Sequence, residues 1–242
     1  MNLSGKTDIG KARKMNQDTF CYGTFGDTGC YAVVCDGMGG HNAGNIASKL
    51  ACDIIGKQIA DGFREEMNAN LVRNLLMSSV AAANAEVYER SKMGEEYFGM
   101  GTTVIAAILR GSLLHIAHVG DSRAYIVNSG EFAQITRDTS IVQELLEDGK
   151  ISDEDARNHP QKNLITRDVG INEQIQVDYL ETMLNRDDKV LICSDGLTNS
   201  CTEEEIHRIV MDTPVADIPQ KLIDRANEHG GMDNITVVII TE

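Results

Sequence analysis

The sequence predicts an α+β fold: a four-layer α/β/β/α sandwich in which two antiparallel β-sheets pack face to face and a pair of helices covers each outer surface. Short apolar, β-branched segments recur along the chain in an order typical of hairpins and meanders. Two pairs of segments with apolar residues at helical spacing occur before and after the central strands. Because each sheet and each helix must bury its apolar face, stacked sheets with outer helices satisfy all of these elements.

The first half of the chain should form one of the helix pairs and most of one sheet. Ile46, Leu50 and Ile54 lie on one helix face at i, i+4 spacing. Arg110-Gly111 separates two apolar runs and is typical of a hairpin turn. The expected helices are residues 42–59 and 66–90, and the expected strands are residues 18–23, 31–35, 102–109, 113–119 and 123–127.

The second half should supply the other helix pair and the remaining strands. Thr202 and Glu205 have the spacing of a capping box at a helix start. Residues 138–168 contain no strand pattern, and a polar insertion of this length in a compact domain is usually functional. The expected helices are residues 140–148, 202–211 and 215–228, and the expected strands are residues 175–180, 189–193 and 235–241.

Composition favours one enzyme-sized domain over residues 1–242 in a reducing compartment. No Pro/Ser/Gly-rich linker divides the 242 residues, and no apolar run approaches membrane-spanning length. The six cysteines show no Cys-x-x-Cys pair, and several lie in apolar strands, which favours the cytoplasm over secretion. The formal charge of −15 argues against nonspecific binding of nucleic acid.

Carboxylates recur at the tips of expected core strands. Asp36, Asp121 and Asp195 each follow an apolar strand, Asp233 precedes one, and a glycine lies beside or near each of them. One Asp-Gly pair alone would more often be a turn, but four such tips can converge at one end of the sheets. Four converging anions repel one another, so the arrangement makes sense only with bound cations. Carboxylate and carbonyl oxygens suit Mg²⁺ or Mn²⁺ better than Zn²⁺, and we expect two such ions.

Six segments in this order carry a resemblance to a known family. The chain resembles the metal-dependent Ser/Thr protein phosphatases of the protein phosphatase 2C family, in their compact bacterial form. One Asp-Gly or Gly-Asp-Ser would mean little, but the whole ordered set is specific. The segments are Arg13-Lys14-Met15-Asn16-Gln17-Asp18, Val34-Cys35-Asp36-Gly37-Met38-Gly39-Gly40-His41, Gly99-Met100-Gly101-Thr102-Thr103, Val119-Gly120-Asp121-Ser122-Arg123, Ser194-Asp195-Gly196-Leu197 and Asp233-Asn234-Ile235-Thr236.

The resemblance implies a hydrolase for phosphoserine and phosphothreonine in proteins. Asp36 would bridge two ions about 3.5–4 Å apart. The Gly37 carbonyl would complete one ion's shell, and Asp195 with Asp233 would hold the other. A water activated between the ions would attack phosphorus, while Arg13 clamps the phosphoryl oxygens. No covalent intermediate is needed, and Ser122 and Ser194 have no obvious base.

Three further residues keep more than one interpretation each. Asp121 matches a ligand of a third, weaker metal position in bacterial relatives, or it caps the turn at Gly120-Asp121-Ser122. Asp18 matches a carboxylate near the metals, or it forms a cap or turn. His41 is close enough to Asp36 to act as general acid for the leaving oxygen, or it bonds a metal-bound water or packs against Asp36.

The resemblance also implies partners. Phosphorylated proteins, including a Ser/Thr kinase of the same cell, would be substrates; we expect a monomer and neither nucleic acid nor membrane as partner. The segment matching 138–168 is a mobile flap in bacterial relatives, and this chain departs there by having Thr139 and Asp168. A pseudophosphatase that only binds phosphoproteins is the main rival, although such proteins often lose residues that are complete here. A calcium-binding module and a nuclease rank below it.

Overall fold

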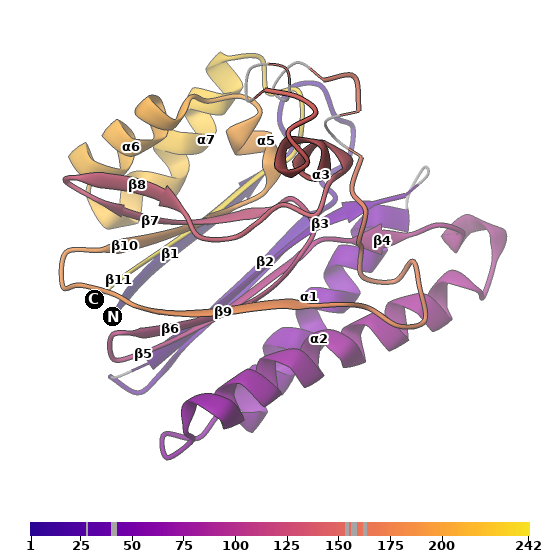
Figure 1. Cartoon of the computed structure of the whole chain (residues 1–242), viewed down its shortest axis with the longest axis horizontal. Coiled ribbons are helices and arrows are strands. Elements are labelled where there is room, and N and C mark those ends of the chain that lie inside the picture. Colours follow the sequence, from indigo (N-terminus) through magenta and orange to yellow (C-terminus); the bar gives the residue numbers. More distant parts are fainter. Residues whose placement is uncertain (28, 40–42, 153–154, 156–158, 162–163) are drawn as a thin grey trace.

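Two antiparallel β-sheets lie face to face with helices on both outer sides (Figure 1). The computed structural model describes residues 1–27, 29–39, 43–152, 155, 159–161 and 164–242. Every pair of adjacent strands in these ranges is antiparallel. The predicted four-layer α+β architecture is therefore confirmed.

Each sheet is assembled from strands that are distant in the chain. The first sheet has the order β1 (Asn2–Asp8), β11 (Ile235–Thr241), β10 (Lys189–Cys193), β7 (Arg123–Asn128) and β8 (Glu131–Gln134). The second has the order β2 (Asp18–Phe25), β3 (Gly29–Met38), β5 (Val104–Arg110), β6 (Leu113–Val119) and β9 (Asp178–Met183), with the short β4 (Gly101–Thr102) paired to β3.

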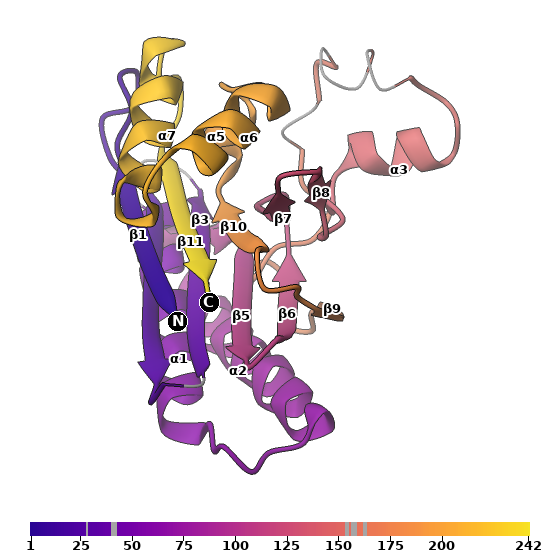
Figure 2. The ribbon, with the colours of Figure 1, turned by 90° about the vertical axis from the view of Figure 1, so that its left-hand side faces the viewer.

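The helices cover the outer faces of both sheets. Helices α1 (Ala43–Gly62) and α2 (Ala69–Ser91) pack on the second sheet. On the first sheet lie α5 (Asp195–Thr198), α6 (Glu203–Asp212) and α7 (Ile218–Glu228), which follows the 3₁₀ turn η2 (Val215–Asp217). Figure 2 shows α3 (Ile141–Glu147) projecting away from the sheets and apart from α5, α6 and α7. The 3₁₀ turn η1 (Glu95–Tyr97) follows α2. No helix in the described ranges is long and apolar enough to cross a membrane.

The alternation of side chains along each strand explains the layering. In β3, Ala32 and Val34 face the core between the sheets, while Val33 and Cys35 face α1 and α2. Because successive residues of a strand point to opposite faces, a strand that is apolar at every position must be covered on both sides. The fully buried β11 is covered in the same way: alternate residues face the helices of the first sheet and the core between the two sheets.

Several element boundaries differ from the sequence-based expectations. Strand β9 begins at Asp178, three residues later than expected, and the helix expected from residue 215 begins as a 3₁₀ turn. Strands β1 and β8 were not expected from the sequence. Both are edge strands, β1 is largely polar and contains Gly5, and neither alternates apolar and polar residues clearly. The sequence also suggests a short turn over residues 152–157, and most of that segment lies outside the described residues.

Candidate metal centre and active site

The predicted carboxylates converge where β3, β6 and β10 end and β11 begins. Asp36 lies near the end of β3, and the negative charge that surrounds it comes from four other carboxylates. The pKa of Asp36 is raised well above its usual range, first by burial and then by the charges of Asp18, Asp195, Asp121 and Asp233. These carboxylates therefore share one electrostatic environment, as the sequence predicted for the four at strand tips.

The same causes raise the pKa of the neighbouring carboxylates. Burial, followed by the charge of Asp233, raises the pKa of Asp195 to about 6. Burial, followed by the charge of Asp195, raises the pKa of Asp121 well above its usual range. Clustered anions in a site of low dielectric cost free energy unless protons or cations neutralise them. The donor set consists of oxygens and suits Mg²⁺ or Mn²⁺.

The carboxylate oxygens of this cluster lie further apart than the ligands of one bound ion. In the described part of the chain, no three aspartates bring carboxylate oxygens within 4.8 Å of one another. Ligands that share one ion lie closer together than this, so the carboxylates would have to draw together around a bound cation. The charges of both Asp195 and Asp121 raise the pKa of Asp36, so these three carboxylates belong to one cluster.

Backbone hydrogen bonds hold Asp36 from both sides. Its amide donates to Thr103 Oγ1 at 3.0 Å, and its carbonyl accepts from the Thr102 hydroxyl and the Thr103 amide, both at 2.9 Å. Thr103 Oγ1 also lies 2.8 Å from Ser122 Oγ. The Gly-Thr-Thr and Gly-Asp-Ser segments thus position the carboxylate of the Asp-Gly segment, a role that the sequence did not reveal.

Gly37 lies where no side chain would fit. A Cβ atom built on it would come within 2.0 Å of the carbonyl oxygen of Gly44, in the first turn of α1. The backbones of β3 and α1 therefore touch at this position, and only glycine allows the approach. The structure places Gly37 directly beside Asp36, which is compatible with its predicted carbonyl ligand.

Asp18 lies opposite Asp36 in the β2–β3 register and is buried. Its Oδ2 accepts hydrogen bonds from Ser194 at 2.8 Å and from Thr236 at 2.7 Å, and its buried Oδ1 has no protein partner among the described residues. Burial raises its pKa to about 7 against these two hydrogen bonds. The charges of Asp195 and Asp233 also raise this pKa, so a buried oxygen without a donor here is suited to a cation or its water. The turn or cap alternative is not what holds it, since its partners come from β11 and the end of β10.

Ser194 corrects one expectation. The sequence suggested that it has no base, yet its hydroxyl donates to Asp18 and accepts from the Thr236 amide at 2.9 Å. The partner was missed because it lies on β2, far from Ser194 in the chain. Ser194 is fully buried, so this bond orients Asp18 and does not expose a nucleophile.

Arg13 lies at the open side of the carboxylate cluster. Its Nη2 donates to Asp233 Oδ2 at 2.7 Å, and its side chain remains half exposed. Asn234 holds the segment that carries Arg13: its Nδ2 donates to Ile9 O at 2.9 Å and Met15 O at 3.0 Å. Its Oδ1 accepts from the Gln17 amide at 2.8 Å. Asn234 belongs to a recognised segment, but its function as the brace of this loop could not be read from the sequence.

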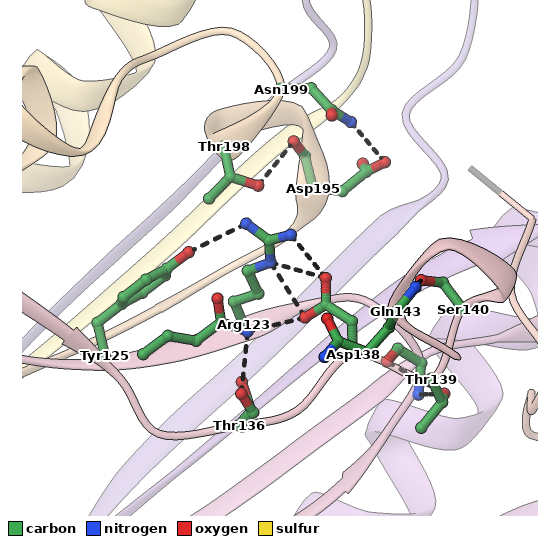
Figure 3. A network of polar contacts seen from close by, with 12 residues as sticks. Arg123, Tyr125, Thr136, Asp138, Thr139, Ser140, Gln143, Asp195, Thr198 and Asn199 are labelled. Atoms are coloured by element: carbon green, nitrogen blue, oxygen red, sulfur yellow. Dashed lines mark hydrogen bonds and ion pairs between the residues drawn. The ribbon is translucent and has the colours of Figure 1, made fainter. Parts of the chain in front are cut away.

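Asp121 borders the insertion at 138–168. Gly120, which has a φ of +108°, donates its amide to Thr139 Oγ1 at 2.9 Å and accepts the Thr139 amide at 2.8 Å. The neighbouring Arg123 donates through Nε to both oxygens of Asp138 and through Nη2 to Oδ2 at 2.6 Å (Figure 3). The first residues of the insertion are therefore bound to the strand end that carries Asp121. His41, the candidate general acid, lies outside the described residues.

Comparison with known proteins identifies the family. The family described as Protein phosphatase 2C matches residues 10–235. Protein phosphatase PhpP of Streptococcus pneumoniae is 38% identical over 243 residues, which cover 100% of this chain and 97% of that protein. The Streptococcus agalactiae serine/threonine phosphatase structure is 36% identical with a TM-score of 0.92, covering 100% of this chain and 99% of that chain.

A metal-loaded structure is also similar. The catalytic domain of the serine threonine protein phosphatase PstP, in complex with two manganese ions, is 30% identical with a TM-score of 0.84. The match covers 98% of this chain and 96% of that chain. Sequence and fold agree over nearly the whole length of every relative named. This chain belongs to the protein phosphatase 2C family and, like its bacterial relatives, is a serine/threonine protein phosphatase.

Proposed function

We propose that this phosphatase hydrolyses phosphoserine and phosphothreonine at a centre of two Mn²⁺ or Mg²⁺ ions held by Asp36, the Gly37 carbonyl, Asp195 and Asp233. The observation that carries the proposal is the convergence of carboxylates whose charges raise the pKa of Asp36. Such a cluster gains free energy when cations neutralise it. The two manganese ions in the similar PstP domain support this number of ions.

When bound, divalent ions held by these residues would supply positive charge that stabilises the phosphoryl oxygens and lowers the pKa of a coordinated water. The chain's own residues position the carboxylates that would bind these ions. Thr102 and Thr103 fix the backbone of Asp36, and Ser194 with Thr236 holds one oxygen of Asp18 so that the other faces the centre.

Arg13 is proposed to bind the substrate phosphoryl group. Its guanidinium already meets the oxygen of Asp233 at 2.7 Å, so it lies at the edge of the carboxylate cluster with its remaining donors toward solvent. The planar donors of arginine match two phosphoryl oxygens, which would orient phosphorus for in-line attack. His41 is proposed as the general acid that protonates the leaving serine or threonine oxygen.

Asp121 with Asp195 is proposed as a third, weaker cation position. The charge of Asp195 is the first electrostatic cause of the raised pKa of Asp121 after burial. Through Gly120 and Thr139, this position is directly linked to the start of the insertion at 138–168, for which we propose a flap role in substrate handling.

In the cell, we propose that the chain acts as a single catalytic domain over residues 1–242. Its substrates would be phosphorylated cytoplasmic proteins, among them a Ser/Thr kinase whose action it reverses. We propose that it acts as a monomer. The acidic charge of −15 supports protein partners over nucleic acid.

The decisive test is turnover of a phosphothreonine peptide with and without added Mn²⁺, in the wild type and in Asp36→Asn. We expect phosphate release that depends on the metal, and loss of at least about 10³-fold in kcat for the variant, because it removes the central charged ligand. Peptide binding without turnover by the metal-loaded wild type would favour the pseudophosphatase alternative. Undiminished turnover after exhaustive chelation would exclude the two-ion centre.

A further inference from the structure

A second group of metal-type donors lies in the outer helical layer. The group consists of Cys201, which follows α5; Glu205, in the first turn of α6; and His229, at the C-terminal end of α7. One donor atom from each lies within 4.8 Å of the other two, and no other group of three in the described ranges meets this condition. Figure 1 shows α5, α6 and α7 together on the outer side of the first sheet.

The three donor types differ from those of the carboxylate centre. A thiol, an imidazole and a carboxylate are the ligands that Zn²⁺ takes in proteins. Tetrahedral Zn–N and Zn–O bonds of about 2.0–2.2 Å would place the nitrogen and oxygen about 3.3–3.5 Å apart. His229 Nε2 and Glu205 Oε1 are already 3.7 Å apart, so little movement is required.

The imidazole is oriented for metal binding by a bond outside the cluster. His229 Nδ1 lies 2.7 Å from the carbonyl oxygen of Ser200. Because a carbonyl can only accept, Nδ1 carries the proton, and in the neutral ring Nε2 then presents its lone pair toward Glu205. Metal-binding histidines almost always donate their other ring N–H in this way.

The other two donors are also held in place. Glu205 Oε2 accepts the Thr202 amide at 3.1 Å in the capping box, which leaves Oε1 on the side of His229. Cys201 is a free thiol, more than nine-tenths buried. Burial raises its pKa to about 11, so cation binding would break the S–H bond, form a metal–sulfur bond and release one proton to the buffer.

Arg225 is the competitor for this position. Its Nε donates to Glu205 Oε1 at 3.1 Å, its Nη2 contacts the same oxygen, and its Nη1 donates to Glu228 Oε2 at 2.9 Å. A cation would take over Glu205 Oε1 while Arg225 keeps Glu228. An ion network of Arg225, Glu205 and His229 without any metal is the plain alternative. It predicts no thiolate-bound cation, and no gain in cation affinity when Arg225 is removed.

We propose that Cys201, Glu205 and His229 form a zinc-type cation site, separate from the carboxylate centre, that ties the start of α6 to the end of α7. The segments it joins carry Asp195 at the start of α5 and Asp233 just after α7. A cation here would therefore cross-link two segments that each supply a carboxylate to the other centre.

Cobalt absorption distinguishes the two kinds of centre. The full-length protein, saturated with Mg²⁺, is titrated with Co²⁺ and then with Zn²⁺. The carboxylate centre offers oxygens, so a thiolate-to-cobalt charge-transfer band reports only a site with a cysteine ligand. We expect the band in the wild type with one cobalt per chain, and its loss when Zn²⁺ displaces cobalt.

Four variants test which residues bind the cobalt ion. Cys201→Ser should abolish the band, and His229→Gln should weaken binding at least about tenfold, since even loss of a ligand's hydrogen-bond partner costs about 10–100-fold. Cys21→Ser, a control in β2, should keep the band, and Arg225→Gln should tighten binding by removing the competing cation. Phosphate release with Mn²⁺ should be retained in Cys201→Ser. A wild type without the band, a band that persists in Cys201→Ser, or weaker binding in Arg225→Gln would overturn the proposal.

Discussion

Arg13 Nη2 donates to Asp233 Oδ2 at 2.7 Å, which joins the N-terminal loop to the segment before β11. The first of these residues is the candidate phosphate ligand and the second is a candidate metal ligand. The Arg13 side chain is 51% exposed, and an ion pair so open to solvent typically contributes less than about 1 kcal/mol to folding. The main effect of this pair is therefore to position the Arg13 guanidinium rather than to stabilise the fold.

Replacing Arg13 by alanine should impair substrate use without unfolding the protein. Loss of a charged hydrogen bond to the phosphoryl group costs about 1.5–3 kcal/mol, so kcat/KM for a phosphopeptide should fall about 10–100-fold. The Tm should change by less than about 4 °C. Lys14→Ala, a neighbouring exposed cation, should leave kcat/KM within about twofold. Equal losses in the two variants would show that Arg13 acts only through general charge.

Asp36→Asn should abolish turnover and yet not destabilise the metal-free protein. The pKa of Asp36 is raised well above its usual range by burial and neighbouring carboxylates, so its charge opposes folding when no cation is present. We expect the Tm in EDTA to be equal to or higher than that of the wild type. Asp53→Asn is the control on α1, since Asp53 forms an exposed pair with Lys49 and should alter neither property. A large drop in Tm for Asp36→Asn in EDTA would contradict this account.

Stability of the metal-free protein should fall as pH rises toward 8. Asp195 and Asp18 have folded-state pKa values of about 6 and about 7, above the value near 4 of an unfolded chain. The folded state thus binds more protons than the unfolded state in this window, and the free energy of unfolding decreases with pH. Burial lowers the pKa of His118 to about 4, which acts in the opposite direction below about pH 6.5.

The measurement is therefore urea unfolding in EDTA between pH 6.5 and 8. We expect a loss of about 1 kcal/mol, absent in saturating Mg²⁺, where the ionised carboxylates are neutralised. A free energy of unfolding in EDTA that stays constant or rises across this range would show that burial and neighbouring charges do not raise the pKa of these carboxylates in the fold.

Breaking the Arg123–Asp138 pair should destabilise the protein and loosen the insertion. Asp138 is buried and takes three contacts from Arg123, so Asp138→Asn should cost about 2–3 kcal/mol, or about 5–10 °C in Tm (Figure 3). A double-mutant cycle with Arg123→Gln should give a coupling energy of at least about 1 kcal/mol.

The adjacent pair of Arg137 and Glu147 is the matched control. Both of these side chains are about half exposed, and Arg137→Gln should cost less than about 1 kcal/mol. Turnover of a phosphopeptide should fall in Asp138→Asn more than in Arg137→Gln, because Thr139 links this segment to Gly120 beside Asp121. Similar effects of the two variants on Tm would contradict the special role of Arg123.

Local patterns predicted those parts of the molecule whose signal lies within a few residues. The capping box at Thr202 and Glu205 is present, and the apolar runs that become β3, β5, β6, β10 and β11 form strands. The edge strand β1 was not predicted from the sequence, because a polar strand with one open edge needs no alternation of apolar and polar residues. Its structure depends on the seven-residue ladder with β11 at the other end of the chain.

The sequence by itself determined that apolar strands end beside glycine at carboxylates that can converge at one end of the sheets. It also determined the family, through six ordered segments. Only the tertiary structure decided which residues position the site. Thr103 and Ser122 hold Asp36, and Ser194 and Thr236 hold Asp18. Asn234 holds the loop that carries Arg13. The physical reason is that these hydrogen bonds join residues far apart in the chain, and their partners are selected by the packing of the two sheets rather than by local spacing.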